Sequence, residues 1–261
     1  IFNSGSVNVT NSSFTNTTAN RYGGAIFNSG SVNVTNSSFT NTTVNQYGGA
    51  IYASGGGSVN VTNSSFTNTT AKNGGGAIYI DSGSVTVTNS SFTNTTANQF
   101  YGGAIYNSGS VTVTNSSFTN TTANQYGGAI YNNRGSVTVT NSSFTNTTAQ
   151  YGGGAISINS GSVTVTNSTF INNSASKGAS ICTWGALNVK DSTFNSLNAN
   201  GTAIIYIISD MNVNLTNNTI QSNLLPIYNQ GGIFVSLTTL TFHNVTVEEG
   251  ENATLTAVLT D

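Results

Sequence analysis

An eight-residue segment, NSSFTNTT, recurs at a nearly constant interval, and this interval constrains the fold more than any other feature of the sequence. The segment begins at Asn11 and returns unchanged at Asn36, Asn63, Asn89, Asn115 and Asn141. Its phenylalanine recurs at intervals of 24 to 27 residues, at Phe14, Phe39, Phe66, Phe92, Phe118, Phe144, Phe170 and Phe194, with Ile220 continuing the series. A fixed period of this length is typical of solenoids, in which each repeat forms one coil.

Each repeat predicts short strands and tight corners. One unit, GGAIYNSGSVTVTNSSFTNTTANQY, runs from Gly102 to Tyr126 and is rich in weak helix formers. Its SVTVT segment alternates apolar and polar residues, as a strand with one buried face does. We therefore expect Ile105, Val111, Val113 and Phe118 to point inward. One unit cannot bury this apolar surface alone, so successive units must stack.

Stacking equivalent strands makes all of them parallel, and the chirality of parallel crossovers favours a right-handed coil. The sequence thus predicts an all-β fold, a right-handed parallel β-helix of about nine to ten coils with roughly 26 residues per coil, over residues 1–236. Identical residues then form columns along the rod. We expect stacked amides to form a corner ladder in one of them, at Asn11, Asn36, Asn63, Asn89, Asn115, Asn141 and Asn167, with Asp191 and Asn217 following.

The GGAI and SxF…NTTA segments resemble repeats of adhesin-like right-handed β-helix surface proteins of methanogenic archaea. They are also similar to chlamydial polymorphic outer-membrane protein repeats, with their GGA[ILV] and FxxN motifs. Phe170 with Asn173 matches FxxN, whereas in faithful units such as Phe118–Thr121 the asparagine is third. The resemblance implies a pectin lyase-like fold and an extracellular, cell-surface protein that acts in adhesion.

The repeats stop near residue 236, and VTVEEGENATLTAVLTD follows from Val245 to Asp261. This segment resembles the opening strands of the immunoglobulin-like modules found after β-helices in surface proteins. The sequence therefore predicts two parts, the helix over 1–236 and a linker with a truncated immunoglobulin-like module over 237–261.

The low content of charged residues restricts the kinds of partner that the protein could bind. Only 5% of the residues are charged and the formal net charge is −2, which gives no basic footprint for nucleic acid. The apolar runs fall short of the roughly 20 residues that cross a bilayer, so we expect no membrane insertion. The single cysteine, Cys182, is interpreted as a small apolar residue. A monomeric rod without cofactor is expected.

The residues that could carry chemistry lie far apart. Before the C-terminal segment the acids are Asp81, Asp191 and Asp210, and the coil count separates Asp81 from Asp191 by roughly 20 Å. Glycosidases need two carboxylates about 5–9.5 Å apart. Lys190 beside Asp191 is interpreted as a surface pair, and the lone His243 has no acidic partner in the sequence. We expect no catalytic residue and no metal site, with a polysaccharide lyase or glycosidase as the alternative.

Repeated surface features suggest binding instead. An outward aromatic column is expected at Tyr52, Tyr79, Tyr106 and Tyr131, either as a platform for sugar rings or as a self-stacking stiffener. Thr-x-Thr pairs, as in Thr112 and Thr114, resemble an ice-binding array and give a third functional alternative. The sequons expected to accept glycans are Asn16, Asn41, Asn68, Asn94, Asn120 and Asn146. The sequence therefore predicts a non-catalytic cell-surface adhesin or stalk that contacts glycans or partner surfaces.

Overall fold

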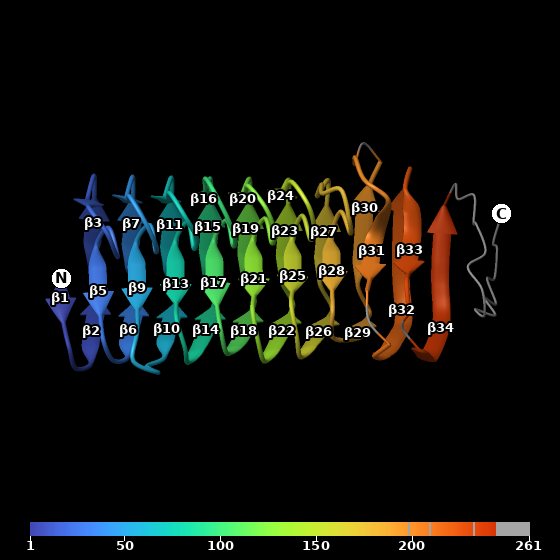
Figure 1. Ribbon diagram of the computed structural model, residues 1–261, viewed down its shortest axis with the longest axis horizontal. Coiled ribbons are helices and arrows are strands. Elements are labelled where there is room, and N and C mark those ends of the chain that lie inside the picture. Colours follow the sequence, from blue (N-terminus) through green and yellow to red (C-terminus); the bar gives the residue numbers. More distant parts are fainter. Residues whose placement is uncertain (198, 209, 232, 244–261) are drawn as a thin grey trace.

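The chain forms a parallel β-solenoid of about nine coils in the computed structural model (Figure 1). The structure describes residues 1–197, 199–208, 210–231 and 233–243, the last segment by its backbone alone. Three parallel sheets run along the rod, each strand pairing with its equivalents in the coils before and after. At about 4.8 Å per coil, nine coils span roughly 40 Å. The sequence-based prediction of the fold is confirmed.

The first sheet carries the GGAI segments. Its ten strands over the described residues are β1 (Phe2–Asn3), β5 (Ile26–Asn28), β9 (Ile51–Ala53), β13 (Ile78–Ile80), β17 (Ile105–Asn107), β21 (Ile130–Asn132), β25 (Ile156–Ile158), β28 (Ile181–Thr183), β31 (Ala203–Ile207) and β33 (Leu225–Asn229).

The second sheet has two strand columns that join at the C-terminal end. The SVTVT column holds β2 (Val7–Thr10), β6 (Val32–Thr35), β10 (Val59–Thr62), β14 (Ser84–Thr88), β18 (Ser110–Thr114), β22 (Ser136–Thr140), β26 (Ser162–Thr166) and β29 (Ala186–Lys190). The SFT column holds β3 (Ser13–Thr15), β7 (Ser38–Thr40), β11 (Ser65–Thr67), β15 (Ser91–Thr93), β19 (Ser117–Thr119), β23 (Ser143–Thr145), β27 (Thr169–Ile171) and β30 (Thr193–Ser196). The two long strands β32 (Asn212–Ser222) and β34 (Ile233–His243) continue this sheet.

The third sheet is short and covers the first six coils only, within the described residues. Its strands are β4 (Thr18–Ala19), β8 (Thr43–Val44), β12 (Thr70–Ala71), β16 (Thr96–Ala97), β20 (Thr122–Ala123) and β24 (Thr148–Ala149).

Asparagine and glycine make the corners between these strands. Asn115 and Asn120, the first and sixth residues of NSSFTNTT, have φ values of 49° and 53°. Asparagine tolerates this left-handed region better than most residues, because its short side chain can form hydrogen bonds with the nearby backbone. Gly102 has a φ of 67°, and a Cβ on Gly103 would lie 2.0 Å from the carbonyl oxygen of Gly128. The corner geometry therefore explains why these positions repeat so faithfully.

The core consists of columns of identical side chains. Phe118 is fully buried, and its ring stacks between those of Phe92 and Phe144 at centroid distances of 4.8 Å. The inward positions expected in this unit, Ile105, Val111 and Val113, are also 0% exposed. Strand register places each of them against its equivalent in the next coil. The register thus turns a sequence repeat into a continuous hydrophobic core.

A threonine column lies inside the rod beyond the second corner. Thr42, Thr69, Thr95, Thr121 and Thr147 are 0% exposed. The column ends where Asn173, the asparagine of the FxxN match, accepts bonds from the backbone N–H of Thr147 at 2.9 Å and from its hydroxyl at 2.7 Å. The third residue after the phenylalanine therefore faces inward, whether it is threonine or asparagine.

The parallel pairing extends past residue 236. Strand β34 pairs with β32 as far as the register Gln221–His243. Residues 237–243, which the sequence assigns to a linker, therefore continue the solenoid sheet, because backbone pairing persists after the repeat motif has faded. The remainder of the expected immunoglobulin-like module, residues 244–261, lies outside the described residues.

Candidate functional site

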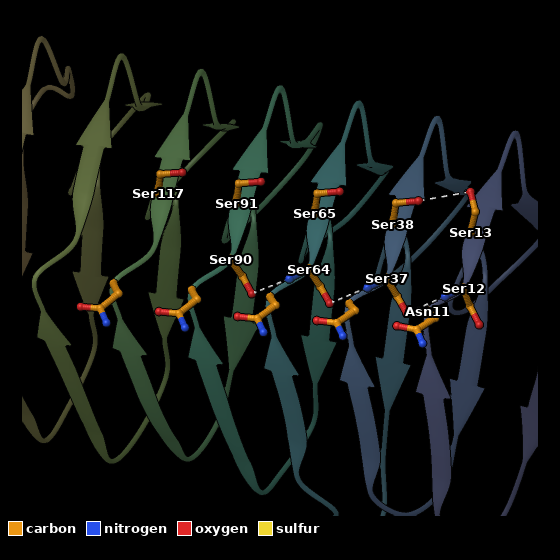
Figure 2. A pocket seen from close by; sticks show the side chains of 14 residues that line it. Asn11, Ser12, Ser13, Ser37, Ser38, Ser64, Ser65, Ser90, Ser91 and Ser117 are labelled. Atoms are coloured by element: carbon orange, nitrogen blue, oxygen red, sulfur yellow. Dashed lines mark hydrogen bonds between the residues drawn. The ribbon is translucent and has the colours of Figure 1, made fainter.

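A long polar groove follows the corner between the two strand columns of the second sheet (Figure 2). We call it the Asn–Ser–Ser groove, because each coil contributes the first three residues of NSSF. Its larger part has a volume of about 960 Å³, lies widely open to solvent and is lined by Asn11, Ser12, Ser13, Asn36, Ser37, Ser38, Asn63, Ser64, Ser65, Asn89, Ser90, Ser91, Asn115 and Ser117. A second part of about 460 Å³ continues it along Asn115, Ser116, Ser117, Asn141, Ser142, Ser143, Asn167 and Thr169.

The inner serine of each coil is a structural residue. Ser116 is 5% exposed, and its Oγ donates to the carbonyl oxygen of Thr114 at 2.8 Å. The same Oγ accepts the backbone N–H of Ser90 at 3.1 Å. Figure 2 shows this pattern at Ser37, Ser64 and Ser90, whose side chains point along the rod to the neighbouring coil. These hydroxyls form a continuous serine ladder that satisfies the corner backbone.

This serine ladder is not among the features predicted above, although the alternation of strand residues indicates it. The inner serine precedes the buried phenylalanine by two residues, as Ser37 precedes Phe39, and both are buried. Alternate residues of a strand share one face, so the serine is expected inside once the phenylalanine is placed there.

The outer serines and the first asparagines remain available to a ligand. The outer serines stand on the SFT strands, as Ser65, Ser91 and Ser117 do, and are partly exposed. The asparagines Asn63 and Asn89 are exposed at the left-handed corner. Hydroxyl and amide groups both donate and accept hydrogen bonds. The lining residues contain no titratable group, so the groove offers neutral polar recognition that repeats coil by coil.

The amide ladder lies in a different column from the predicted one. Within the described residues, no amide-to-amide bond joins Asn11, Asn36, Asn63, Asn89 and Asn115; in that column Asn167 donates to Asn141 and Asn217 donates to Asp191. A continuous ladder runs instead through the second asparagine of NSSFTNTT. There each Nδ2 donates to the preceding Oδ1 at 3.0–3.3 Å, along Asn16, Asn41, Asn68, Asn94, Asn120 and Asn146.

This finding bears on the predicted glycan acceptors, because the same six asparagines were expected to carry them. They are exposed, as expected. However, the Nδ2 atom to which a glycan would attach is a hydrogen-bond donor in every member after Asn16. A glycan would replace one of the two Nδ2 hydrogens and leave the other for the ladder, but sugars on successive coils, about 4.8 Å apart, would compete for space.

The predicted aromatic column is stacked, but it is exposed only in part: Tyr52 and Tyr131 are buried, whereas Tyr79 and Tyr106 are partly exposed. Tyr79 stacks on Tyr52 at 5.4 Å and on Tyr106 at 4.3 Å. The exposed fraction is only 7% for Tyr52 and 9% for Tyr131. The prediction of an open aromatic face is therefore wrong for Tyr52 and Tyr131. Corner tyrosines from the preceding coil reach over Tyr52, Tyr79 and Tyr131, which strand alternation alone does not predict.

Three such covering contacts have similar geometry. Ring centroids lie 4.5 Å apart for Tyr22 over Tyr52, 4.6 Å for Tyr47 over Tyr79 and 4.5 Å for Tyr101 over Tyr131. Burial raises the pKa of the Tyr52, Tyr79 and Tyr131 hydroxyls above the usual value of 10.0. The Tyr52 hydroxyl also donates to the Asp81 carboxylate, which disfavours ionisation further.

The acidic and basic residues do not gather into a site. The predicted surface pair is confirmed, since Lys190 Nζ lies 3.7 Å from Asp191 Oδ2 with both side chains at least a third exposed. Among the described residues, no group of three or more His, Cys, Asp or Glu side chains could hold a metal ion. His243 lies in β34, and its side chain is outside the described part.

The Thr-x-Thr pairs stand in register on the neighbouring column, with Thr112 opposite Thr86 and Thr138. In the first coils the same position holds an amide ladder, in which Asn33 donates to Asn8 and Asn60 to Asn33, each at 2.8 Å. No described helix is long and apolar enough to cross a membrane.

Comparison with known proteins agrees with this architecture. The sequence matches the model of the family described as right handed beta helix region, over residues 1–150 and 49–205. No curated protein and no solved structure matches significantly.

Proposed function

Because this chain belongs to the right-handed β-helix family, we propose that it is a non-catalytic adhesive rod whose sides bind glycans or the surface proteins of other cells. The observation that carries the proposal is the Asn–Ser–Ser groove, which presents the same amide and hydroxyl groups on coil after coil. An extended neutral polymer laid along the groove would meet equivalent partners about every 4.8 Å. Many weak contacts along one chain then add through multivalency.

The proposed setting is the cell surface. The resemblance of GGAI and NTTA to adhesin-like proteins of methanogenic archaea supports an extracellular rod, in which the solenoid would hold a following immunoglobulin-like module away from the envelope. Low charge supports recognition by hydrogen bonding instead of ion pairing, since only 5% of the residues are charged.

A non-catalytic role is supported by the contacts of two of the three acids among the described residues, while the third, Asp210, is exposed at a corner. Asp81 accepts the Tyr52 hydroxyl, and Asp191 sits in the first asparagine column beside Lys190. The groove itself supplies no general base for its serines. A lyase or glycosidase on this fold is the alternative that the experiment must address.

The experiment measures binding to a panel of immobilised neutral polysaccharides and host glycans, with product analysis of each glycan afterwards. The test variant is Ser65→Arg/Ser117→Arg, which places a bulky cation two coils apart in the groove. Its matched control, Thr86→Arg/Thr138→Arg, has the same charge and spacing on the adjacent column. We expect the groove variant to lose at least tenfold in affinity and the control to retain it. Equal glycan affinity of the two variants would show that the groove is not the binding site. If the unmodified protein bound no glycan of the panel, the rod would be only a structural spacer.

A further inference from the structure

The aromatic column of the first sheet is interrupted at two successive coils. Register continues from Tyr131 to Ser157, Cys182 and Tyr206, so two small residues replace tyrosine. Ser157 and Cys182 are both 0% exposed. A neighbouring ring must therefore cover the gap.

Tyr126 lies over this gap. A Cβ placed on Gly152 would be 3.1 Å from the Tyr126 ring and 3.0 Å from Cys182 Sγ, so the glycine lets the ring and the thiol approach more closely than most side chains would allow. Trp184 meets the same ring edge-on, with centroids 5.8 Å apart. Departures from the repeat in two successive coils, at Gly152 and Ser157 and then at Cys182 and Trp184, thus give an aromatic arrangement that the faithful repeats lack.

Four further side chains complete what we call the Trp184 cluster, made of Tyr126, Tyr151, Lys177, Trp184, Tyr206 and Tyr228. Tyr151 lies 5.7 Å from Tyr126, and Tyr206 stacks on Tyr228 at 4.6 Å. Lys177 stands between these two pairs. Its backbone N–H donates a hydrogen bond to the carbonyl oxygen of Tyr151 at 2.8 Å. Its Nζ lies over the Tyr206 ring, 5.3 Å from the ring centroid.

The cluster reaches solvent in part and carries one cation; Tyr126 and Trp184 are partly exposed, whereas Tyr206 is only 6% exposed. Tyr151 is 45% exposed and Tyr228 is 37% exposed, which makes them the most accessible tyrosines among the described residues. Lys177 is exposed and is one of five cationic residues in a chain of net charge −2. Among the described residues the one ion pair is Lys190–Asp191, so the Lys177 ammonium has no carboxylate partner. A ligand that carries a carboxylate could provide one.

We propose that the Trp184 cluster is a single binding site for a carboxylated pyranose within a glycan, a uronic or sialic acid residue. The C–H face of the sugar would pack on the exposed rings, and its carboxylate would pair with Lys177. This inference rests on the proposed glycan-binding function but concerns a separate site. The groove repeats along the rod and is neutral, whereas the Trp184 cluster occurs once and depends on charge.

The test uses the intrinsic fluorescence of Trp184, the only tryptophan of the chain, as a local reporter. The probes are methyl glucuronide, methyl sialoside and the neutral methyl glucoside, with stoichiometry from calorimetry. We expect a saturable fluorescence change at one site per chain for at least one acidic sugar, and binding at least tenfold weaker for methyl glucoside. The acidic sugar that produces the fluorescence change shows whether the site accepts a uronic or a sialic acid.

Lys177→Met keeps the aliphatic stem and should weaken the acidic sugar at least tenfold, to the level of the glucoside. Lys190→Met is the matched control, because Lys190 is also exposed but lies outside the cluster and pairs with Asp191. Equal affinity for the glucoside, no effect of Lys177→Met or several sites per chain would overturn the inference. If polymers still bind the groove of Lys177→Met while acidic sugars never respond, only this inference fails. If no glycan binds any form, the proposed function fails with it.

Discussion

The interior phenylalanine column can be tested by removing one ring from the middle of the rod. Phe118→Ala deletes a side chain that is 0% exposed and stacks between Phe92 and Phe144 at 4.8 Å on either side. Truncating a buried phenylalanine to alanine costs about 3–5 kcal/mol in free energy of unfolding. We expect a value of about 4–5 kcal/mol, because two stacked pairs are lost and each contributes about 0.5–1.5 kcal/mol beyond burial.

The strand register prevents the cavity from closing. Strand β19 pairs with β15 and with β23, which fixes its distance to both neighbours. Phe118→Ile is the matched control, because Ile220 already occupies this column opposite Phe194. It keeps most of the apolar volume and should cost about 1–2 kcal/mol.

Urea denaturation followed by far-UV circular dichroism gives the free energies, and hydrogen exchange locates the effect. In a solenoid each coil contacts only its neighbours, so faster exchange should concentrate in β15, β19 and β23. If Phe118→Ala lost less than about 1 kcal/mol, or no more than Phe118→Ile, the ring would not be part of a packed column.

Three further predictions concern the surface columns. Asn120→Ala should lower the free energy of unfolding by about 1–2 kcal/mol, because alanine is strained at a φ of 53°, whereas Asn120→Gly should lose much less; equal urea midpoints for the two variants would contradict the corner assignment. In a glycosylating host, mass spectrometry should find that Asn94 and Asn120 are not both glycosylated on one chain, since their amides are joined at 3.2 Å and sugars on such close neighbours would compete for space; frequent double occupancy would show that both sugars can be accommodated. The free energy of unfolding should be constant up to about pH 9 and fall above about pH 10. The pKa values of Tyr52, Tyr79 and Tyr131 are raised in the folded state, so the unfolded chain loses these protons at lower pH and is favoured as the pH rises. A urea series in alkaline buffers would measure this decline, and replacing the three tyrosines by phenylalanine should reduce it; an unchanged decline would assign it to other groups.

Alternation and period were sufficient to predict the interior. Placing Phe118 inward places its equivalents inward too, because each coil repeats the same strand register. The corner asparagines also follow from the sequence, since few other residues accept a positive φ. The fold class could therefore be predicted from local rules applied once per repeat.

Other features depend on contacts between coils that no single repeat contains. The sequence has two asparagine columns of equal regularity, and only the side-chain geometry decides that Asn94 and Asn120 belong to the bonded one. Likewise, alternation places Tyr131 outside, but whether it meets solvent depends on Tyr101 reaching over from the preceding coil. The Trp184 cluster could not be predicted because it arises where the repeats diverge.

A non-catalytic adhesive rod is tested most directly by saturation binding to the glycan panel with mass analysis of every bound glycan. We expect saturable binding that Ser65→Arg/Ser117→Arg weakens, with all glycan masses unchanged. Shortened or unsaturated glycans, or no binding to any member of the panel, would contradict a non-catalytic adhesive rod.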